Sequence, residues 1–191
     1  MSKLLVINGS PRKNGNTARM LKTITDYCDK AGVETEFFQA GGNMVHGCIA
    51  CGKCAEHKGE CTFGDDFINE LYQKVKAADA IVIGSPTYYG DVTTEVKALM
   101  DRIGFISGRD GRPLSRKIGA AVVSVRRCGG MHTLDTINHF YGINDMIVPG
   151  STYWNMTLSR DIGDFEKDDE GVATITRLAE NLVYLLEKLK G

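Results

Sequence analysis

The fold of this chain is decided by residues 4–17, which read LLVINGSPRKNGNT. The first four residues form a short, fully apolar run that stops at Asn8, which is typical of a parallel strand buried on both faces. Residues 8–16 are polar and contain two glycines, which predicts a loop. From Thr17 apolar residues recur at helical spacing until Gly32. The stretch therefore predicts a strand, a polar loop and a helix in succession.

The same alternation continues along the chain. Further strands are predicted at residues 33–38, 80–83 and 118–125 and near residues 145–148. Helices are predicted at about residues 17–31, 67–75, 92–103, 134–141 and 172–189. Because most of the strands are continuous apolar runs separated by helices, the chain predicts an α/β fold: a doubly wound, five-stranded parallel sheet with helices on both faces.

Size and composition limit the domain organisation, partners and location that this chain can have. With 191 residues and no linker or repeat, residues 1–191 are expected to form one domain, with a cysteine-rich insertion at about residues 41–64. The net charge of -1, from 23 basic and 24 acidic residues, argues against nucleic acid and anionic membrane as partners. No stretch resembles a secretory leader or a membrane span, so a cytoplasmic location with free thiols is expected.

Four of the six cysteines lie within fourteen residues. Cys48, Cys51, Cys54 and Cys61 have the spacing C-x2-C-x2-C-x6-C, and its first part is the run with which bacterial ferredoxins bind an iron–sulfur cluster. The last interval differs from ferredoxin, where three residues and then a cysteine and a proline would follow. From the spacing alone a zinc site, a disulfide framework and a redox-active thiol pair stay open as alternatives.

Three loops at the predicted carboxyl ends of strands have an unusual composition, and ligands bind at this edge of such sheets. Residues 8–17 offer hydroxyls, amides, glycines and an arginine before a helix. This composition suits a phosphate-binding loop and a plain polar turn about equally. Residues 84–90 place two tyrosines on a loop with a proline, suited to a planar ring or to covering the sheet end. Residues 125–130 contain two arginines and two glycines, suited to an anionic ring or a nicotinamide phosphate, or simply exposed.

Together the three loops describe flavin mononucleotide (FMN) bound to a flavodoxin-type sheet. A fourth segment, residues 151–155, follows the last predicted strand, and its Trp154 is expected either over the site or at a dimer interface. The four histidines show no metal-ligand spacing, and no proton-transfer residue is assigned.

Residues 9–17, residues 84–90 and the segment from Lys97 to Arg102 resemble the NADPH-dependent FMN reductase superfamily. The four clustered cysteines are similar to those of its iron–sulfur flavoprotein branch, including the six-residue interval. The resemblance covers roughly residues 3–150 and implies a flavodoxin-like fold, FMN as cofactor, a four-iron four-sulfur cluster and NAD(P)H as co-substrate. It also implies a homodimer or homotetramer, with the cluster near a flavin across an interface.

The resemblance assigns roles to individual residues. The phosphate would be held by Ser10, Arg12, Asn14, Asn16 and Thr17. The flavin ring would be lined by Pro86, Thr87, Tyr88, Tyr89 and Gly90 and closed by Arg126, Arg127 and Gly130. The cluster would be bound by Cys48, Cys51, Cys54 and Cys61.

The expected function is an FMN-dependent oxidoreductase of iron–sulfur flavoprotein type. It would pass electrons between NAD(P)H or a ferredoxin and a small acceptor such as a flavin, a quinone or an oxygen species. Two alternatives stay open: an NAD(P)H-dependent FMN or quinone reductase without a cluster, and a non-enzymatic FMN electron carrier or redox sensor. A carrier usually has a markedly acidic docking surface, which the net charge of -1 does not supply.

Overall fold

The computed structural model describes residues 1–190 and contains a five-stranded, all-parallel sheet. The strands are β1 (Lys3–Asn8), β2 (Glu34–Gln39), β3 (Ala80–Pro86), β4 (Ile118–Val125) and β5 (Met156–Leu158). Their order is β2-β1-β3-β4-β5, so the direction of winding reverses between β1 and β3. A ligand site is expected outside the carboxyl ends of the strands at this reversal.

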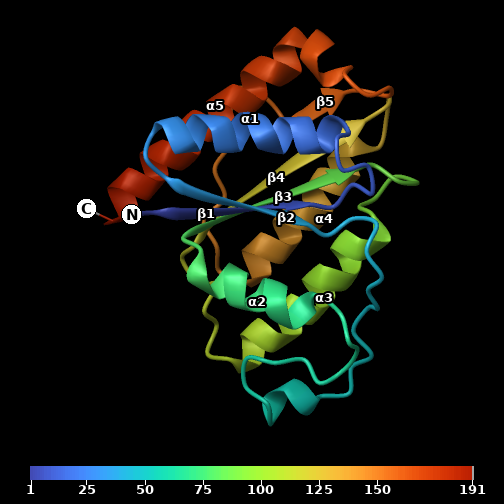
Figure 1. The fold of residues 1–191 in the computed structure, drawn as a ribbon, viewed down its shortest axis with the longest axis vertical. Helices are drawn as coiled ribbons and strands as arrows, with labels where there is room; N and C mark the ends of the chain where they lie inside the picture. The colour runs from blue at the N-terminus through green and yellow to red at the C-terminus, as the bar shows by residue number, and fades with distance from the viewer. Residues whose placement is uncertain (191) are drawn as a thin grey trace.

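Helices cover both faces of the sheet (Figure 1). One face carries α1 (Asn16–Lys30) and α5 (Asp169–Lys190), and the other carries α2 (Ile68–Ala77), α3 (Thr94–Arg109) and α4 (Gly130–Ile143). Alternate residues of β1 enter the two cores, with Leu4 and Val6 on the side of α1 and Leu5 and Ile7 on the side of α2. The doubly wound, flavodoxin-like architecture expected from the sequence is confirmed. Within residues 1–190 no helix is both long and apolar enough to cross a bilayer.

The predicted last strand at residues 145–148 is wrong. Only Ile147 of this segment makes a bridge to β4, and the fifth strand forms further along, where Met156–Leu158 pair with residues 123–125. Between the two lies Pro149, which lacks the amide hydrogen that a continuous ladder requires. The chain therefore runs beside β4 as an irregular segment. It forms a regular strand again only at the carboxyl end of β4.

The cysteine segment between β2 and α2 contains a single short helix, η1 (Lys53–Ala55). Figure 1 shows it as a long loop below α2 and α3, on the far side of these helices from the sheet. The segment packs against α3 through η1, and its Cys61 backbone is hydrogen-bonded to the Asn69 side chain of α2. The segment therefore adds a feature to the fold without interrupting the order of strands.

Candidate functional site

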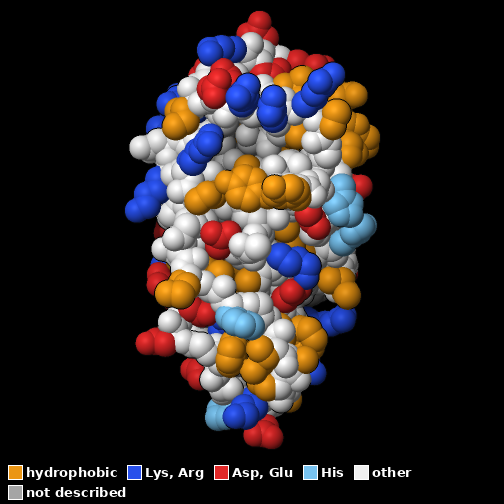
Figure 2. All heavy atoms as spheres, turned by 90° about the vertical axis from the view of Figure 1, so that its right-hand side faces the viewer, with side chains coloured by type: hydrophobic (Ala, Val, Ile, Leu, Met, Phe, Trp, Pro, Cys, Tyr) orange, Lys and Arg blue, Asp and Glu red, His pale blue; other side chains and the backbone are white. Residues whose placement is uncertain are grey.

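A cavity of about 150 Å³ lies at the carboxyl ends of β1, β3 and β4. Its walls come from four segments that are far apart in the sequence: Ser10, Arg12, Gly15, Asn16, Thr17, Pro86, Thr87, Tyr88, Ser124, Arg126, Ser159 and Arg160. Figure 2 views this end of the sheet and shows basic side chains above a band of hydrophobic ones. The three loops singled out in the sequence thus meet at one site.

The first loop is held in shape by its neighbours. The Asn8 carboxamide accepts a hydrogen bond from the Ser10 amide at 3.1 Å and donates one to Gln39 at 2.7 Å. Gln39 in turn donates to the Ser10 carbonyl at 2.8 Å. On the other side, Thr93 donates to the Gly9 carbonyl at 2.9 Å. Since these partners belong to β2 and to the start of α3, the loop is fixed before any ligand arrives.

The start of α1 has the features of an anion site. Gly15 precedes the helix and provides no side-chain cap, so the first amides of α1 are not satisfied by a capping side chain. The hydroxyl residues Ser10 and Thr17 line the same end of the cavity and are 4% and 2% exposed. The charged groups that line the cavity are three arginines with no carboxylate: Arg12, Arg126 and Arg160. The cavity therefore favours a negatively charged group.

Asn16 and Asn14, both expected to hold the phosphate, have other placements. The Asn16 side chain donates to the Asp161 carbonyl at 2.9 Å and accepts from the Gly163 amide at 3.0 Å. Asn16 lines the cavity, but its side chain fastens the turn before α5. Asn14 lies outside the cavity and lines a separate depression with Arg19 and Phe37.

The second loop ends in a tight turn. Tyr88 and Asp91 exchange two backbone hydrogen bonds at 2.8 and 3.0 Å, and the residues between them, Tyr89 and Gly90, both have positive φ. This is the backbone pattern of a type I′ turn, which a tyrosine adopts only at some cost. Tyr88 lines the cavity and is half exposed, whereas Tyr89 projects completely into solvent and Gly90 is not part of the wall.

The third loop contributes one of its three expected residues to the cavity. Arg126 lines it, whereas Arg127 is exposed elsewhere and Gly130 is buried at the start of α4. The two loops touch at Gly129, where an added Cβ would lie 3.2 Å from the Cα of Gly90. A side chain at Gly129 would therefore push the loops apart.

Three cavity residues are missing from the sequence analysis: Ser124, Ser159 and Arg160. The Ser124 and Ser159 hydroxyls are 2.8 Å apart, and Arg12 donates to the Arg160 carbonyl at 3.5 Å. Ser159 and Arg160 directly follow β5 and were missed because the last strand was predicted too early in the chain, whereas Ser124 lies within β4. For the same reason Trp154 was expected after the last strand. It precedes β5 instead and lines a separate cavity of about 430 Å³ with Tyr153 and Leu134.

The four clustered cysteines line a second, smaller cavity. Its other walls are mostly apolar and include Ile49, Phe63, Phe105 and Ile106, together with the guanidinium of Arg102. All six cysteines are free thiols, and Cys28 and Cys128 lie elsewhere. Cys28 is buried in the core, and burial raises the pKa of its thiol to about 12. Among residues 1–190 no three Cys, His, Asp or Glu side chains are arranged to hold a single metal ion.

The comparisons with known proteins agree with this geometry. Residues 2–161 match the model of the NADPH-dependent FMN reductase family. An iron-sulfur flavoprotein of Methanocaldococcus jannaschii is 35% identical over 98% of this chain and 99% of its own length. Another, of Archaeoglobus fulgidus, is 32% identical over 97% of both chains. Among solved structures, a WrbA-like flavodoxin of Agrobacterium tumefaciens superposes with a TM-score of 0.66 at 16% identity, covering 98% of this chain and 99% of that one.

The likeness to the solved structure shows the fold alone, while the family match and the two relatives concern the sequence, the relatives over nearly its whole length. The chain belongs to the NADPH-dependent FMN reductase family, in its iron–sulfur flavoprotein branch.

Proposed function

We propose that this chain is an FMN-dependent oxidoreductase that passes electrons between NAD(P)H or a ferredoxin and a small acceptor such as a flavin, a quinone or an oxygen species. The observation that carries the proposal is the cavity at the reversal of the sheet, with three arginines, the uncapped start of α1 and no carboxylate in its wall. Bound FMN would supply the redox chemistry. The protein supplies position, charge and shape.

The phosphate end of FMN fits the first loop. The amides at the start of α1, the hydroxyls of Ser10 and Thr17 and the guanidinium of Arg12 would bind its oxygens. Arg160, from the turn after β5, adds a positive charge to the same wall. Asn16 would contribute its backbone amide, because its side chain is already used by the turn before α5.

The ring end fits the second and third loops. Pro86, Thr87 and Tyr88 offer an apolar surface and backbone groups, and Arg126 provides a positive charge at the edge of the cavity. Tyr89, Gly90, Arg127 and Gly130 stay proposed ring neighbours, although they are not among the residues that line the cavity.

Four thiols and mostly apolar side chains line the cysteine cavity, and thiolates are the ligands that a soft metal centre prefers. We propose a four-iron four-sulfur cluster held by Cys48, Cys51, Cys54 and Cys61, which would transfer electrons one at a time. The two cavities have no lining residue in common within the described part of the chain. At about 1.5 Å per residue, Arg102 at the cysteine cavity lies roughly 14 Å along α3 from Thr93 beside the phosphate loop.

We also propose, from the family resemblance, a homodimer or homotetramer in which the cluster of one chain lies near the flavin of another. A cytoplasmic location stays a prediction. The two rival functions, a reductase without a cluster and an electron carrier without turnover, share the FMN cavity and differ only in the cysteine cavity and in activity.

The proposal is tested by anaerobic reconstitution with FMN, ferrous iron and sulfide, followed by metal analysis and absorption spectra. We expect one FMN per chain together with cluster absorption, and oxidation of NAD(P)H or of reduced ferredoxin. The absence of both cofactors would refute the proposal. Turnover that survives Cys51→Ser without iron would favour the reductase without a cluster, and FMN binding with no turnover would favour the carrier.

A further inference from the structure

Arg102 is the largest side chain that the structure buries completely, with 1% of its surface exposed. It lies on α3, on the side that faces the cysteine segment. A buried guanidinium is costly unless its charge and its donors are matched, so a chain has a reason to keep one. None of the steps proposed for FMN uses Arg102.

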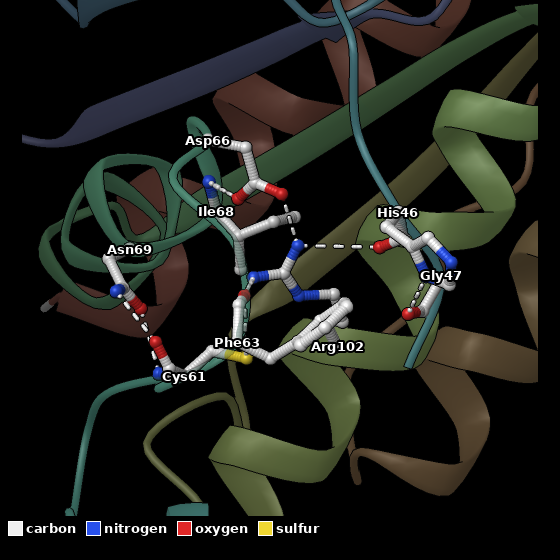
Figure 3. Close-up of polar contacts among 8 residues, drawn as sticks. All are labelled: His46, Gly47, Cys61, Phe63, Asp66, Ile68, Asn69 and Arg102. Carbon is white, nitrogen blue, oxygen red and sulfur yellow. Dashed lines mark hydrogen bonds and ion pairs between the residues drawn. The ribbon is translucent and has the colours of Figure 1, made fainter. Parts of the chain in front are cut away.

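The guanidinium contacts both ends of the cysteine segment (Figure 3). Nη1 donates to the His46 carbonyl at 3.3 Å and forms an ion pair with Asp66, and Nη2 donates to the Phe63 carbonyl. His46 comes two residues before the first clustered cysteine, and Phe63 comes two residues after the last. One side chain of α3 therefore ties together the entrance and the exit of the segment.

The two ends of the cysteine segment also contact each other through their aromatic rings. The His46 and Phe63 rings meet edge to face with centroids 5.2 Å apart, and the guanidinium carbon lies 5.9 Å from the centre of the Phe63 ring. Asp66 also accepts a hydrogen bond from the Ile68 amide at 3.2 Å, so the carboxylate is itself fixed by the start of α2. The guanidinium is thus held from several directions.

One donor of Arg102 is left over. Nε is buried and has no hydrogen-bond partner within residues 1–190, although Arg102 lines the same cavity as the four thiols. Burial opposes the charge of the guanidinium, but Asp66 and the nearby Cys61 raise the pKa of Arg102 above its ordinary value. Arginine stays charged in any case, so a permanent positive charge lies beside the thiols.

We propose that Arg102 is a positioning residue for the metal centre: its guanidinium closes the cysteine segment onto α3 and compensates the negative charge of the thiolate ligands. The inference rests on the proposed cluster. Because reduction adds negative charge to the centre, the guanidinium stabilises the reduced form and raises its reduction potential. Asp66 has the opposite effect on the potential, since it brings a negative charge to the same place.

The experiment compares four variants of the full chain with the unchanged protein. Arg102→Met removes the charge and the hydrogen bonds, Arg102→Lys keeps the charge without the planar fork, and Asp66→Asn keeps the shape of the partner without its charge. Lys97→Met removes an exposed cation from the same helix and serves as the control. FMN affinity reports whether each variant is folded, because the flavin cavity contains none of these residues.

Two quantities are measured. In iron-free protein, the rate at which Ellman's reagent labels the clustered thiols reports closure of the segment. In reconstituted protein, the midpoint potential followed by electron paramagnetic resonance reports the charge. We expect several-fold faster labelling in Arg102→Met and Arg102→Lys, a more negative potential in Arg102→Met, a potential near that of the unchanged protein in Arg102→Lys, and a more positive one in Asp66→Asn. Lys97→Met should change neither quantity.

Opposite shifts of the potential in Arg102→Met and Asp66→Asn would distinguish charge compensation from a general loosening of the loop, which would move both in the same direction. Unchanged labelling and an unchanged potential in Arg102→Met would overturn the inference. If the unchanged protein takes up no iron, the proposed cluster and the charge effect are both refuted. The labelling rates would still show whether Arg102 holds the cysteine segment against α3.

Discussion

Gly9 lies where two backbone segments approach too closely for a side chain. An added Cβ would be 2.1 Å from the Val96 side chain and 2.8 Å from the Gly84 carbonyl oxygen. We expect Gly9→Ala to destabilise the fold by about 1–3 kcal/mol, because the carbonyl of β3 cannot move aside, and to weaken FMN binding. Urea unfolding and FMN titration measure the two effects.

The matched control is Gly142→Ala in α4, where an added Cβ meets nothing within 4 Å. This substitution should leave FMN affinity unchanged and stabilise the protein by up to about 1 kcal/mol, since alanine favours helix. A Gly9→Ala variant as stable as Gly142→Ala would contradict the close approach.

Asp164 holds the turn that brings Arg160 to the flavin cavity. Its carboxylate binds Lys167 at 2.9 Å and accepts from the amides of Asp161 at 2.7 Å and Arg160 at 3.1 Å, and these contacts lower its pKa to about 2. A lowered pKa in the folded state means that the stabilisation is present above the ordinary value of 3.8 and is lost as the pH falls toward 2.

We therefore expect the stability difference between the unchanged protein and Asp164→Asn to be full at pH 6 and to shrink between about pH 4 and 2. Urea unfolding across this pH range measures the difference, and carboxyl titration by nuclear magnetic resonance gives the pKa itself. In Lys167→Met the midpoint should move up toward the ordinary value. A constant difference between pH 6 and 3 would refute the assignment.

At the scale of elements, α3 connects the two cavities, and Thr93 secures its start. The Thr93 hydroxyl accepts from the Val96 amide at 3.4 Å as the helix cap and donates to the Gly9 carbonyl at 2.9 Å. Thr93→Val should cost about 0.5–2 kcal/mol through loss of the cap, and it should also weaken FMN binding because the phosphate loop loses a support. Thermal unfolding with and without FMN measures both.

Thr94→Val is the control for that substitution. Thr94 is exposed and its hydroxyl contacts only Glu95, so the same chemical change one residue later should have little effect. Equal losses in the two variants would show that loss of any hydroxyl at the helix start, and not of the cap in particular, is responsible.

The elements differ in how far the sequence could predict them. β1, β3 and β4 are buried on both faces and so appear as unbroken apolar runs, which made their positions readable. β5 has three residues at the edge of the sheet and pairs only with the last part of β4, so no periodicity marked it. The apolar Ile147 and Val148 were more conspicuous, although they are 37% and 43% exposed.

The residues of the flavin cavity were predictable to the same extent as the strands they follow. Residues supplied by loops after the well-marked strands were predicted, among them Ser10, Arg12, Tyr88 and Arg126. Ser159 and Arg160 were missed because they follow β5. The role of the Asn16 side chain could not be predicted, since its partners lie 145 residues or more along the chain and only the tertiary fold brings them to it.

At the scale of the whole molecule, the cysteine segment and the flavin cavity are built separately. Replacing all four clustered cysteines by serine should abolish iron binding but change the FMN dissociation constant by no more than about twofold, because distant sites contribute additively. Metal analysis and FMN fluorescence titration measure the two. A large loss of FMN affinity would show that the cysteines support the flavin cavity, contrary to the separation of the lining residues.

The Asn16 carboxamide links the start of α1 to a surface turn that is remote in sequence. Ile162, at the centre of that turn, is 58% exposed, although its neighbours on both sides are anchored to the residue that opens α1. An environment-sensitive fluorophore at position 162 would therefore sit outside the flavin cavity yet sense any tightening of its phosphate end. This turn is the place at which loading of the protein could be followed optically without touching the cofactor.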